Sequence, residues 1–91
     1  MTDPIAERFA LAQTIASEGG ALASRFFNAR DSLIIEDKMN PQDMVSQADR
    51  EVELLLRQRI TVAFPEDAIL GEEGGALGGT SGFTWVLDPI D

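Results

Sequence analysis

Carboxylates are the residues of this chain whose types and spacing could do chemistry. Asp88 and Asp91 lie three positions apart after an apolar run, Glu72 and Glu73 follow an earlier apolar run, and Asp49 lies further upstream. Several carboxylates gathered in one place repel one another, and bound divalent cations are the usual way to offset that repulsion. Oxygen ligands without nitrogen or sulfur favour Mg²⁺, Mn²⁺ or Ca²⁺. If these side chains converge, they predict a metal centre.

Each of these groups also has an ordinary structural interpretation. Asp49 suits a helix cap, Glu72 and Glu73 suit a solvated turn, and Asp88 and Asp91 suit the turn that follows a buried strand. Taken one at a time, these structural roles are the more common ones. Only the combination and the order of the groups favour a metal centre.

Other kinds of chemistry are removed by composition. The 91 residues contain no cysteine and no histidine, which excludes thiolate or imidazole nucleophiles, disulfides and metal sites built on Cys or His within them. The formal net charge is −9, and no lysine or arginine follows Arg59. A purely anionic C-terminal third repels nucleic acid, and a phosphate ligand would have to arrive with metal ions.

The remaining composition is that of an ordinary globular domain, with 44% hydrophobic and 25% charged residues. No apolar run approaches the roughly 20 residues of a membrane span, and the N-terminus lacks the pattern of a signal peptide. We expect one soluble, cytoplasmic domain at most, with neither a membrane nor a nucleic acid as partner.

The first element that must position the carboxylates is a long helix. Asp3 and Pro4 suit its N-cap and first turn, and we expect it to end near Phe27. The pair Gly19 and Gly20 should mark a break or a close-packed neighbour. The expected buried stripe consists of Ile5, Phe9, Ala12, Ala16, Gly19, Ala23 and Phe26.

A second helix is expected after a polar loop. The loop covers Asp37–Asp43, with Asn40–Pro41 as its turn signal. The helix should begin near Ser46, which with Asp49 would form a capping box, and Pro65 should end it. Its expected buried face consists of Ala48, Val52, Leu55, Leu56, Ile60 and Ala63.

Short β-like runs are expected over Ser32–Glu36, Ala68–Leu70 and Phe83–Leu87, with a glycine-rich hairpin or loop through Gly82 before the last of them. The fold class is therefore α+β or layered α/β, with two helices packed on a sheet. If the last two runs are neighbouring strands with the same direction, the carboxylates that follow them meet at one edge.

Three stretches, in this order, resemble the inositol monophosphatase family of metal-dependent, lithium-sensitive phosphatases. They are DMVSQAD at Asp43–Asp49, GEE at Gly71–Glu73 and WVLDPID at Trp85–Asp91, and the resemblance runs from about Lys38 to the last residue. GEE alone carries no weight, but the three motifs at family-like separations are specific. The resemblance implies that residues 1–91 form a single N-terminal portion of a phosphatase domain, truncated at the metal-binding signature, within a layered αβαβα sandwich.

The resemblance also implies the metal ligands. Glu72, Asp88 and the backbone carbonyl of Ile90 would bind a first metal, and Asp88 would bridge to a second metal that Asp91 also binds. The implied cofactor is Mg²⁺, with Mn²⁺ as the second choice. One metal would lower the pKa of a bound water, and another would neutralise the leaving oxygens.

Further roles come from the same resemblance. Glu72 would also accept the proton of the attacking water, and Asp49 would help to hold the surroundings of that water. Glu73 is implied in the outer shell of the site. Lys38 is implied in a mobile loop near a third, weaker metal.

This sequence departs from the family pattern in three places. Ser46 stands where threonine is usual and Met44 where leucine is common, and both changes are mild. The larger departure is that the sequence stops at the signature. Family members continue with a glycine, a threonine that assists the water, a later aspartate ligand and the substrate-binding residues. We therefore expect these 91 residues alone to be inactive.

Two functions are carried forward. The first is Mg²⁺-dependent hydrolysis of a small phosphate monoester, of the inositol phosphate or histidinol phosphate class, by a metal-activated water. Its partners would be the small phosphorylated substrate and, since dimers are common in the family, a second copy of the chain. The alternative is a non-catalytic acidic module that binds divalent cations or a basic protein.

Overall fold

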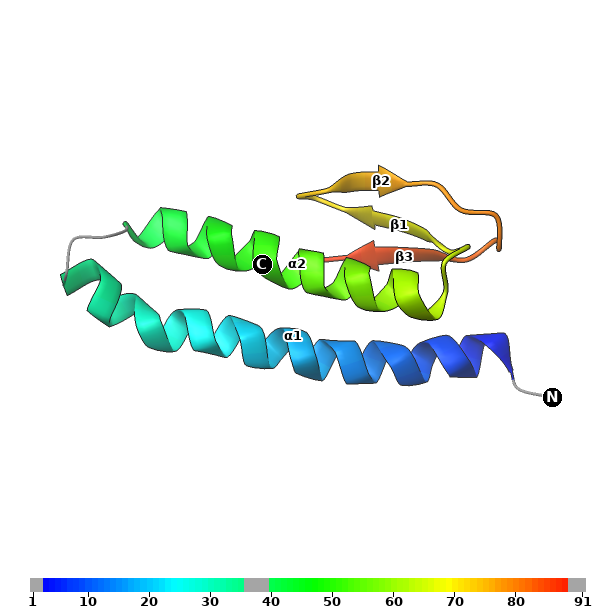
Figure 1. Cartoon of the computed structure of the whole chain (residues 1–91), viewed down its shortest axis with the longest axis horizontal. Coiled ribbons are helices and arrows are strands. Elements are labelled where there is room, and N and C mark those ends of the chain that lie inside the picture. Colours follow the sequence, from blue (N-terminus) through cyan, green and yellow to red (C-terminus); the bar gives the residue numbers. More distant parts are fainter. Residues whose placement is uncertain (1–2, 36–39, 89–91) are drawn as a thin grey trace.

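The computed structural model describes residues 3–35 and 40–88. Two long antiparallel helices, α1 (Pro4–Ile35) and α2 (Pro41–Ala63), lie along the molecule, and a three-stranded sheet packs against them (Figure 1). Neither helix, within the ranges described, has the length and apolarity needed to cross a membrane. The arrangement confirms the expected α+β class.

Helix α1 begins where the sequence predicts and ends later. The Asp3 carboxylate accepts a hydrogen bond from the Ile5 backbone N–H at 2.9 Å, which is the expected N-cap. The predicted strand over Ser32–Glu36 is wrong, because Ser32–Ile35 continue the helix and Glu36 lies outside the described residues. Residues 28–35 contain no glycine or proline that would stop the helix, and each further residue adds one backbone hydrogen bond.

Helix α2 begins five residues earlier than expected. Asn40 is its N-cap, with an extended backbone and a side-chain oxygen that accepts the Asp43 backbone N–H at 2.8 Å. Pro41 occupies the first turn, where its missing N–H costs nothing. The Asn40–Pro41 signal therefore starts a helix, and the proposed capping box of Ser46 and Asp49 is wrong because both lie inside α2. The rest of the predicted loop, residues 37–39, lies outside the described residues.

The hydrophobic core lies between the helices and one face of the sheet. Gly19 is the close approach between the helices, since a Cβ there would lie 3.3 Å from Cγ1 of Val52. The core consists of Ile15, Val52, Leu56, Ile60, Ile69 and Leu87. The stripe predicted for α1 is only partly confirmed, because Ile5 and Phe9 are 68% and 63% exposed. On α2, Ala63 is exposed as well.

The sheet has the order β2-β1-β3, formed by β1 (Ala68–Gly71), β2 (Gly75–Leu77) and β3 (Thr84–Leu87). β1 pairs antiparallel with β2 and parallel with β3. Both β1 and β3 point toward the amino-terminal half of α2 (Figure 1). The condition raised by the sequence, that these two strands are neighbours with the same direction, is met.

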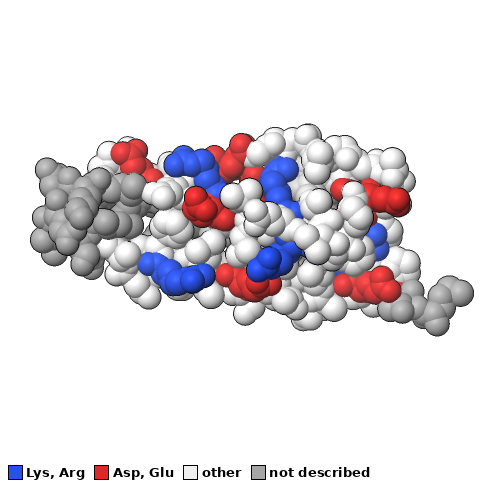
Figure 2. All heavy atoms as spheres, in the orientation of Figure 1, with Lys and Arg blue, Asp and Glu red and all other residues white. Residues whose placement is uncertain are grey.

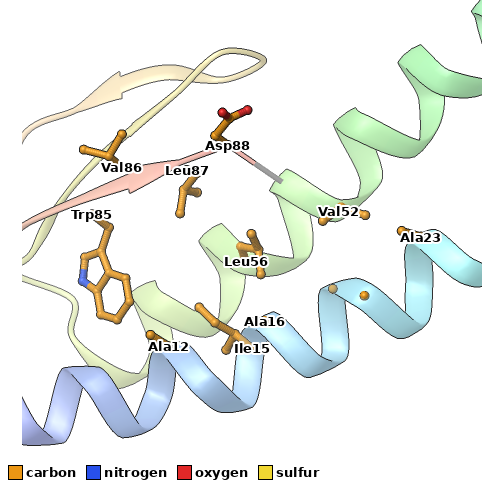
Figure 3. Close-up of a pocket in the computed structure, with 12 residues that line it drawn as sticks. Ala12, Ile15, Ala16, Ala23, Val52, Leu56, Trp85, Val86, Leu87 and Asp88 are labelled. Atoms are coloured by element: carbon orange, nitrogen blue, oxygen red, sulfur yellow. The ribbon is translucent and has the colours of Figure 1, made fainter. Parts of the chain in front are cut away.

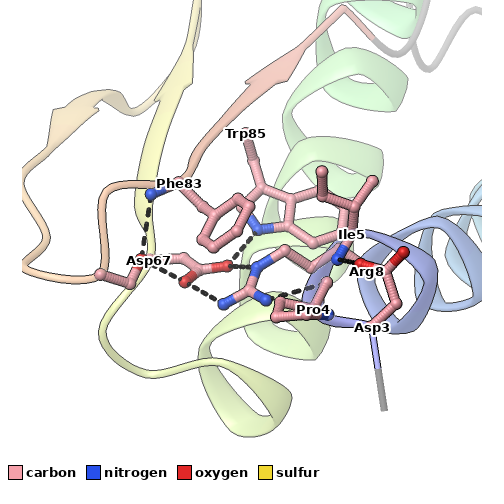
Figure 4. A network of polar contacts seen from close by, with 8 residues as sticks. Asp3, Pro4, Ile5, Arg8, Asp67, Phe83 and Trp85 are labelled. Atoms are coloured by element: carbon pink, nitrogen blue, oxygen red, sulfur yellow. Dashed lines mark hydrogen bonds and ion pairs between the residues drawn. The ribbon is translucent and has the colours of Figure 1, made fainter. Parts of the chain in front are cut away.

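A buried carboxylate, Asp67, joins the amino end of α1 to the sheet. It accepts hydrogen bonds from Arg8 at 2.7 and 2.8 Å, from the Ser81 hydroxyl at 2.6 Å and from the Trp85 indole N–H at 2.9 Å (Figure 4). The Arg8 guanidinium also lies 3.8 Å from the centre of the Phe83 ring. The charge of Asp67 is thus neutralised and fully hydrogen-bonded inside the fold.

The position of the α2 start generates a first prediction. Asn40→Ala should destabilise the protein by about 1 kcal/mol, because it removes the N-cap acceptor, whereas Asn40→Ser should be nearly neutral. Ser46→Ala, inside the helix and exposed, is the matched control and should leave the free energy of unfolding almost unchanged. Urea titrations of the three variants measure the difference, and a larger loss at Ser46 than at Asn40 would contradict the observed helix start.

The Asp67 network generates a second prediction. The hydrogen bonds from Arg8, and then those from Ser81 and Trp85, hold the pKa of Asp67 well below its usual range, although burial opposes them. A carboxylate with a lowered folded-state pKa stabilises fully above its unfolded pKa of about 3.9, and the stabilisation is lost as the pH falls further. The protein should therefore lose stability on acidification below about pH 4.

Asp67→Asn isolates this effect. The variant should be less stable at pH 7 by about 2 kcal/mol, since hydrogen bonds to a charged group are lost. It should also lose less stability than the wild type between pH 7 and pH 3, as followed by Trp85 fluorescence in urea. Glu66→Gln, an exposed neighbour, should behave like the wild type. Equal pH dependence in Asp67→Asn and wild type would contradict the assignment.

Candidate metal centre

The carboxyl ends of β1 and β3 bring two of the predicted ligands to one edge of the sheet. Gly71 is paired with Leu87 in the parallel register, so Glu72 and Asp88 are each the next residue along neighbouring strands. Both residues are exposed, whereas Leu87 is buried. Figure 3 shows Leu87 pointing toward α2 and Asp88 pointing the opposite way. The pairing thus places one carboxylate-bearing residue at the end of each strand.

Glu53 of α2 forms hydrogen bonds with the backbone of the turn that carries Glu72. The Glu53 carboxylate accepts the backbone N–H of Glu73 at 3.2 Å and that of Gly74 at 2.7 Å, and it pairs with Arg57 at 3.0 Å. Burial alone would raise the pKa of Glu53, but the two backbone N–H groups and Arg57 together lower it below its usual value. Glu53 is therefore a buried anion that fixes the backbone beside Glu72.

The sequence interpretation missed Glu53, although a signal was present. Glu53 directly follows the buried Val52 and lies four residues before Arg57, so an ion pair along the edge of the apolar face of α2 could have been expected. What the pattern lacked was the partner across the fold, the backbone of residues 73 and 74.

Asp49 lies in the interior of α2, one turn before Glu53 and on the same side of the helix. One of its carboxylate oxygens, Oδ1, is buried and has no hydrogen-bond partner among the residues that the structure describes. A buried oxygen of this kind costs free energy unless a ligand or water satisfies it. Oδ1 of Asp49 is therefore a buried hydrogen-bond acceptor without a donor among the described residues.

The other predicted site residues divide into two sets. The Glu73 side chain is exposed, and its backbone N–H is held by Glu53. Lys38, Ile90 and Asp91 lie outside the described residues, so their roles stay predictions. Among the side chains that the structure describes, no three Asp or Glu residues form a group that could hold a metal ion.

The residues present nevertheless fit a hard divalent cation. The donors at the edge are carboxylate oxygens, which Mg²⁺ and Mn²⁺ prefer. The register aligns Glu72 with Asp88 at this end of the sheet, and Asp49 offers a further carboxylate oxygen on α2 that has no hydrogen-bond partner among the described residues. The assignment of these residues as ligands remains a prediction.

Charges of both signs are interspersed along the helices on the face shown in Figure 2. The strands and their connecting turns contribute only acidic residues, because no lysine or arginine follows Arg59 in the sequence. Among the carboxylates after Arg59, Asp67 is neutralised by Arg8 of α1. The segments that carry Glu72 and Asp88 therefore bring negative charge to their edge of the sheet and no positive charge of their own.

Beside this edge lies an apolar groove of about 340 Å³ between the two helices and β3. Ile15, Val52, Leu56 and Trp85 line it, and Asp88 lies at its rim (Figure 3). Apart from Asp88, the lining offers no charged side chain. The groove therefore offers an apolar surface, and its one charged side chain, Asp88, lies at the end of β3.

Comparisons with known proteins agree with this arrangement. The sequence profile of the inositol monophosphatase family matches residues 5–91. The chain is 41% identical over 76 residues to Inositol-1-monophosphatase of Bacillus subtilis. The aligned region covers 81% of this chain and 28% of that protein. The chain is also 38% identical over 81 residues to Histidinol-phosphatase of Chlorobaculum parvum, covering 89% of this chain and 30% of that protein.

A mammalian relative gives the same picture. The chain is 33% identical over 95 residues to Inositol monophosphatase 1 of Sus scrofa, covering 100% of this chain and 34% of that protein. This chain thus spans about a third of the length of the curated relatives that it matches. The profile match and these identities show that the chain belongs to the inositol monophosphatase family.

Proposed function

We propose that this chain supplies the amino-terminal half of a metal site in an enzyme that hydrolyses small phosphate monoesters in a Mg²⁺-dependent reaction. The observation that carries the proposal is the parallel register of β1 and β3, which aligns Glu72 with Asp88 at one edge of the sheet. The names of the relatives, inositol-1-monophosphatase and histidinol-phosphatase, support a phosphorylated alcohol as substrate class.

In the proposed site, Glu72, Asp88, Asp91 and the backbone carbonyl of Ile90 would hold the divalent cations. When bound, such cations supply Lewis acidity that activates water and neutralises phosphate charge. Mg²⁺ is the proposed cation, and Mn²⁺ is the second choice for the same set of oxygen donors.

The protein's own residues have three tasks in this scheme. Glu72 lies at an exposed strand end, where it can also accept a proton from the attacking water. Asp49 offers its unsatisfied oxygen as a further acceptor on α2. Glu73 contributes its backbone N–H to the support of the turn. Lys38 remains a proposed loop residue near the site.

Other properties are proposed on the family membership alone. They are inhibition by lithium, a cytoplasmic location and assembly into a homodimer. The competing function, a non-catalytic acidic module for cations or a basic protein, predicts metal binding without turnover. A family-length protein carrying these residues, assayed for phosphate release from inositol phosphate, histidinol phosphate and nucleotide bisphosphates with and without Mg²⁺, separates the two functions.

The ligand assignment generates a prediction. Asp88→Asn in the family-length protein should weaken Mg²⁺ binding at least about tenfold and lower phosphate release at fixed Mg²⁺, because one of the carboxylates that would hold the cations is lost. Calorimetric titration with Mg²⁺ measures the first effect, and a phosphate assay measures the second.

Glu66→Gln is the matched control for that experiment, since it removes one exposed carboxylate from the same third of the chain. It should leave Mg²⁺ affinity unchanged. Asp67 is unsuitable as a control because its carboxylate is part of the buried network with Arg8. Equal losses of Mg²⁺ affinity at positions 66 and 88 would show that general negative charge, rather than ligation by Asp88, attracts the cation.

A further inference from the structure

Glu53 is buried beneath the turn that follows β1. Only 1% of the residue is exposed, yet it carries a charge, and its backbone partners Glu73 and Gly74 are 20 and 21 residues away in the sequence. Those two N–H groups belong to the residues that directly follow Glu72. The carboxylate therefore acts on the part of the backbone that sets the direction of the Glu72 side chain.

The turn is fitted closely around Glu53 and its partner Arg57. A Cβ on Gly71 would lie 2.4 Å from Oε1 of Glu53, and a Cβ on Gly74 would lie 2.7 Å from Nε of Arg57. Arg57 also donates a hydrogen bond to the backbone carbonyl of Gly75. The ion pair thus contacts the turn both before and after Glu72.

Stability alone is a weak reason for this arrangement. Replacing a buried ion pair by apolar residues of similar volume is often neutral or stabilising, because both charges must be removed from water. What an apolar pair cannot do is accept two backbone N–H groups and so hold their directions. The charged pair therefore gives this turn a defined backbone, beside the exposed residue that follows β1.

We propose that Glu53 is a positioning residue, which holds Glu72 in the orientation that binds a divalent cation at the edge formed by β1 and β3. Glu53 acts through the backbone of residues 73 and 74 and does not touch the cation. The inference rests on the proposed function of that edge as a metal centre. Arg57 supports this arrangement in two ways. Its guanidinium neutralises Glu53, and it donates a hydrogen bond to the backbone carbonyl of Gly75.

The experiment compares Mg²⁺ binding by the family-length protein and its Glu53→Gln variant. Glutamine keeps one acceptor oxygen but presents an NH₂ group to the second N–H, so the turn loses a hydrogen bond. Calorimetric titration of the metal-free protein should show Mg²⁺ affinity reduced about tenfold or more. In phosphate-release assays, excess Mg²⁺ should restore kcat, and amide exchange at residues 73 and 74 should be faster.

Two further variants separate positioning from general effects. Glu51→Gln removes the same charge from an exposed position of the same helix and should bind Mg²⁺ like the wild type. Gly71→Ala keeps the charge of Glu53 but displaces its carboxylate, so it should also weaken Mg²⁺ binding. A purely structural role would lower the urea midpoint in both altered variants without changing their Mg²⁺ affinity.

Each outcome is decisive. Unchanged Mg²⁺ affinity in Glu53→Gln or in Gly71→Ala, whichever folds, overturns the inference and leaves the proposed function standing. A loss of affinity in Glu51→Gln equal to that in Glu53→Gln also overturns it, because charge alone would then explain the effect. A wild-type protein that neither binds Mg²⁺ nor releases phosphate overturns the proposed function, and the role of Glu53 falls with it.

Discussion

The neutralisation of Asp67 is the interaction on which the rest of this structure depends. Its carboxylate lies just before β1, and it receives the guanidinium of Arg8 from α1 and the indole N–H of Trp85 from β3. A buried carboxylate without such partners would be strongly destabilising. Because the partners come from distant parts of the sequence, satisfying this one charge requires α1, β1 and β3 to be in place together.

The chain uses the same residue types in two opposite environments. Asp67 and Glu53 are buried, each with an arginine and further N–H or O–H donors, and they organise the backbone around them. Glu72 and Asp88 are exposed at the ends of adjacent strands. Asp67 and Glu53 therefore stabilise the fold around them, whereas the side chains of Glu72 and Asp88 are open to solvent.

Much of the arrangement could be predicted from local patterns. The apolar runs before Glu72 and Asp88 predicted the two strands, and the structure confirms their parallel pairing. The helix limits were harder, because Asn40–Pro41 is a signal for both a turn and a helix start, and the choice depends on the residues after Pro41. Likewise, the short apolar run Ser32–Ile35 suits either a strand or a helix end.

The roles of Glu53 and Asp67 were beyond a local interpretation. The Glu73 backbone lies 20 residues from Glu53, and Arg8 lies 59 residues from Asp67, and no periodic pattern records such contacts. The spacing of Ser46 and Asp49 predicts a helix start, whereas the buried oxygen of Asp49 depends on the packing around α2. The roles proposed for residues 38, 90 and 91 rest on the resemblance to the family.

The contact between Gly71 and Glu53 has an evolutionary consequence. A side chain at position 71 would overlap the carboxylate at position 53, so neither position is free to drift alone. A lineage that acquires a larger residue at 71 must first shorten or withdraw the side chain at 53, and the intermediate sequence carries an unsupported turn. The two positions should therefore be inherited as a pair, although they lie 18 positions apart in the chain.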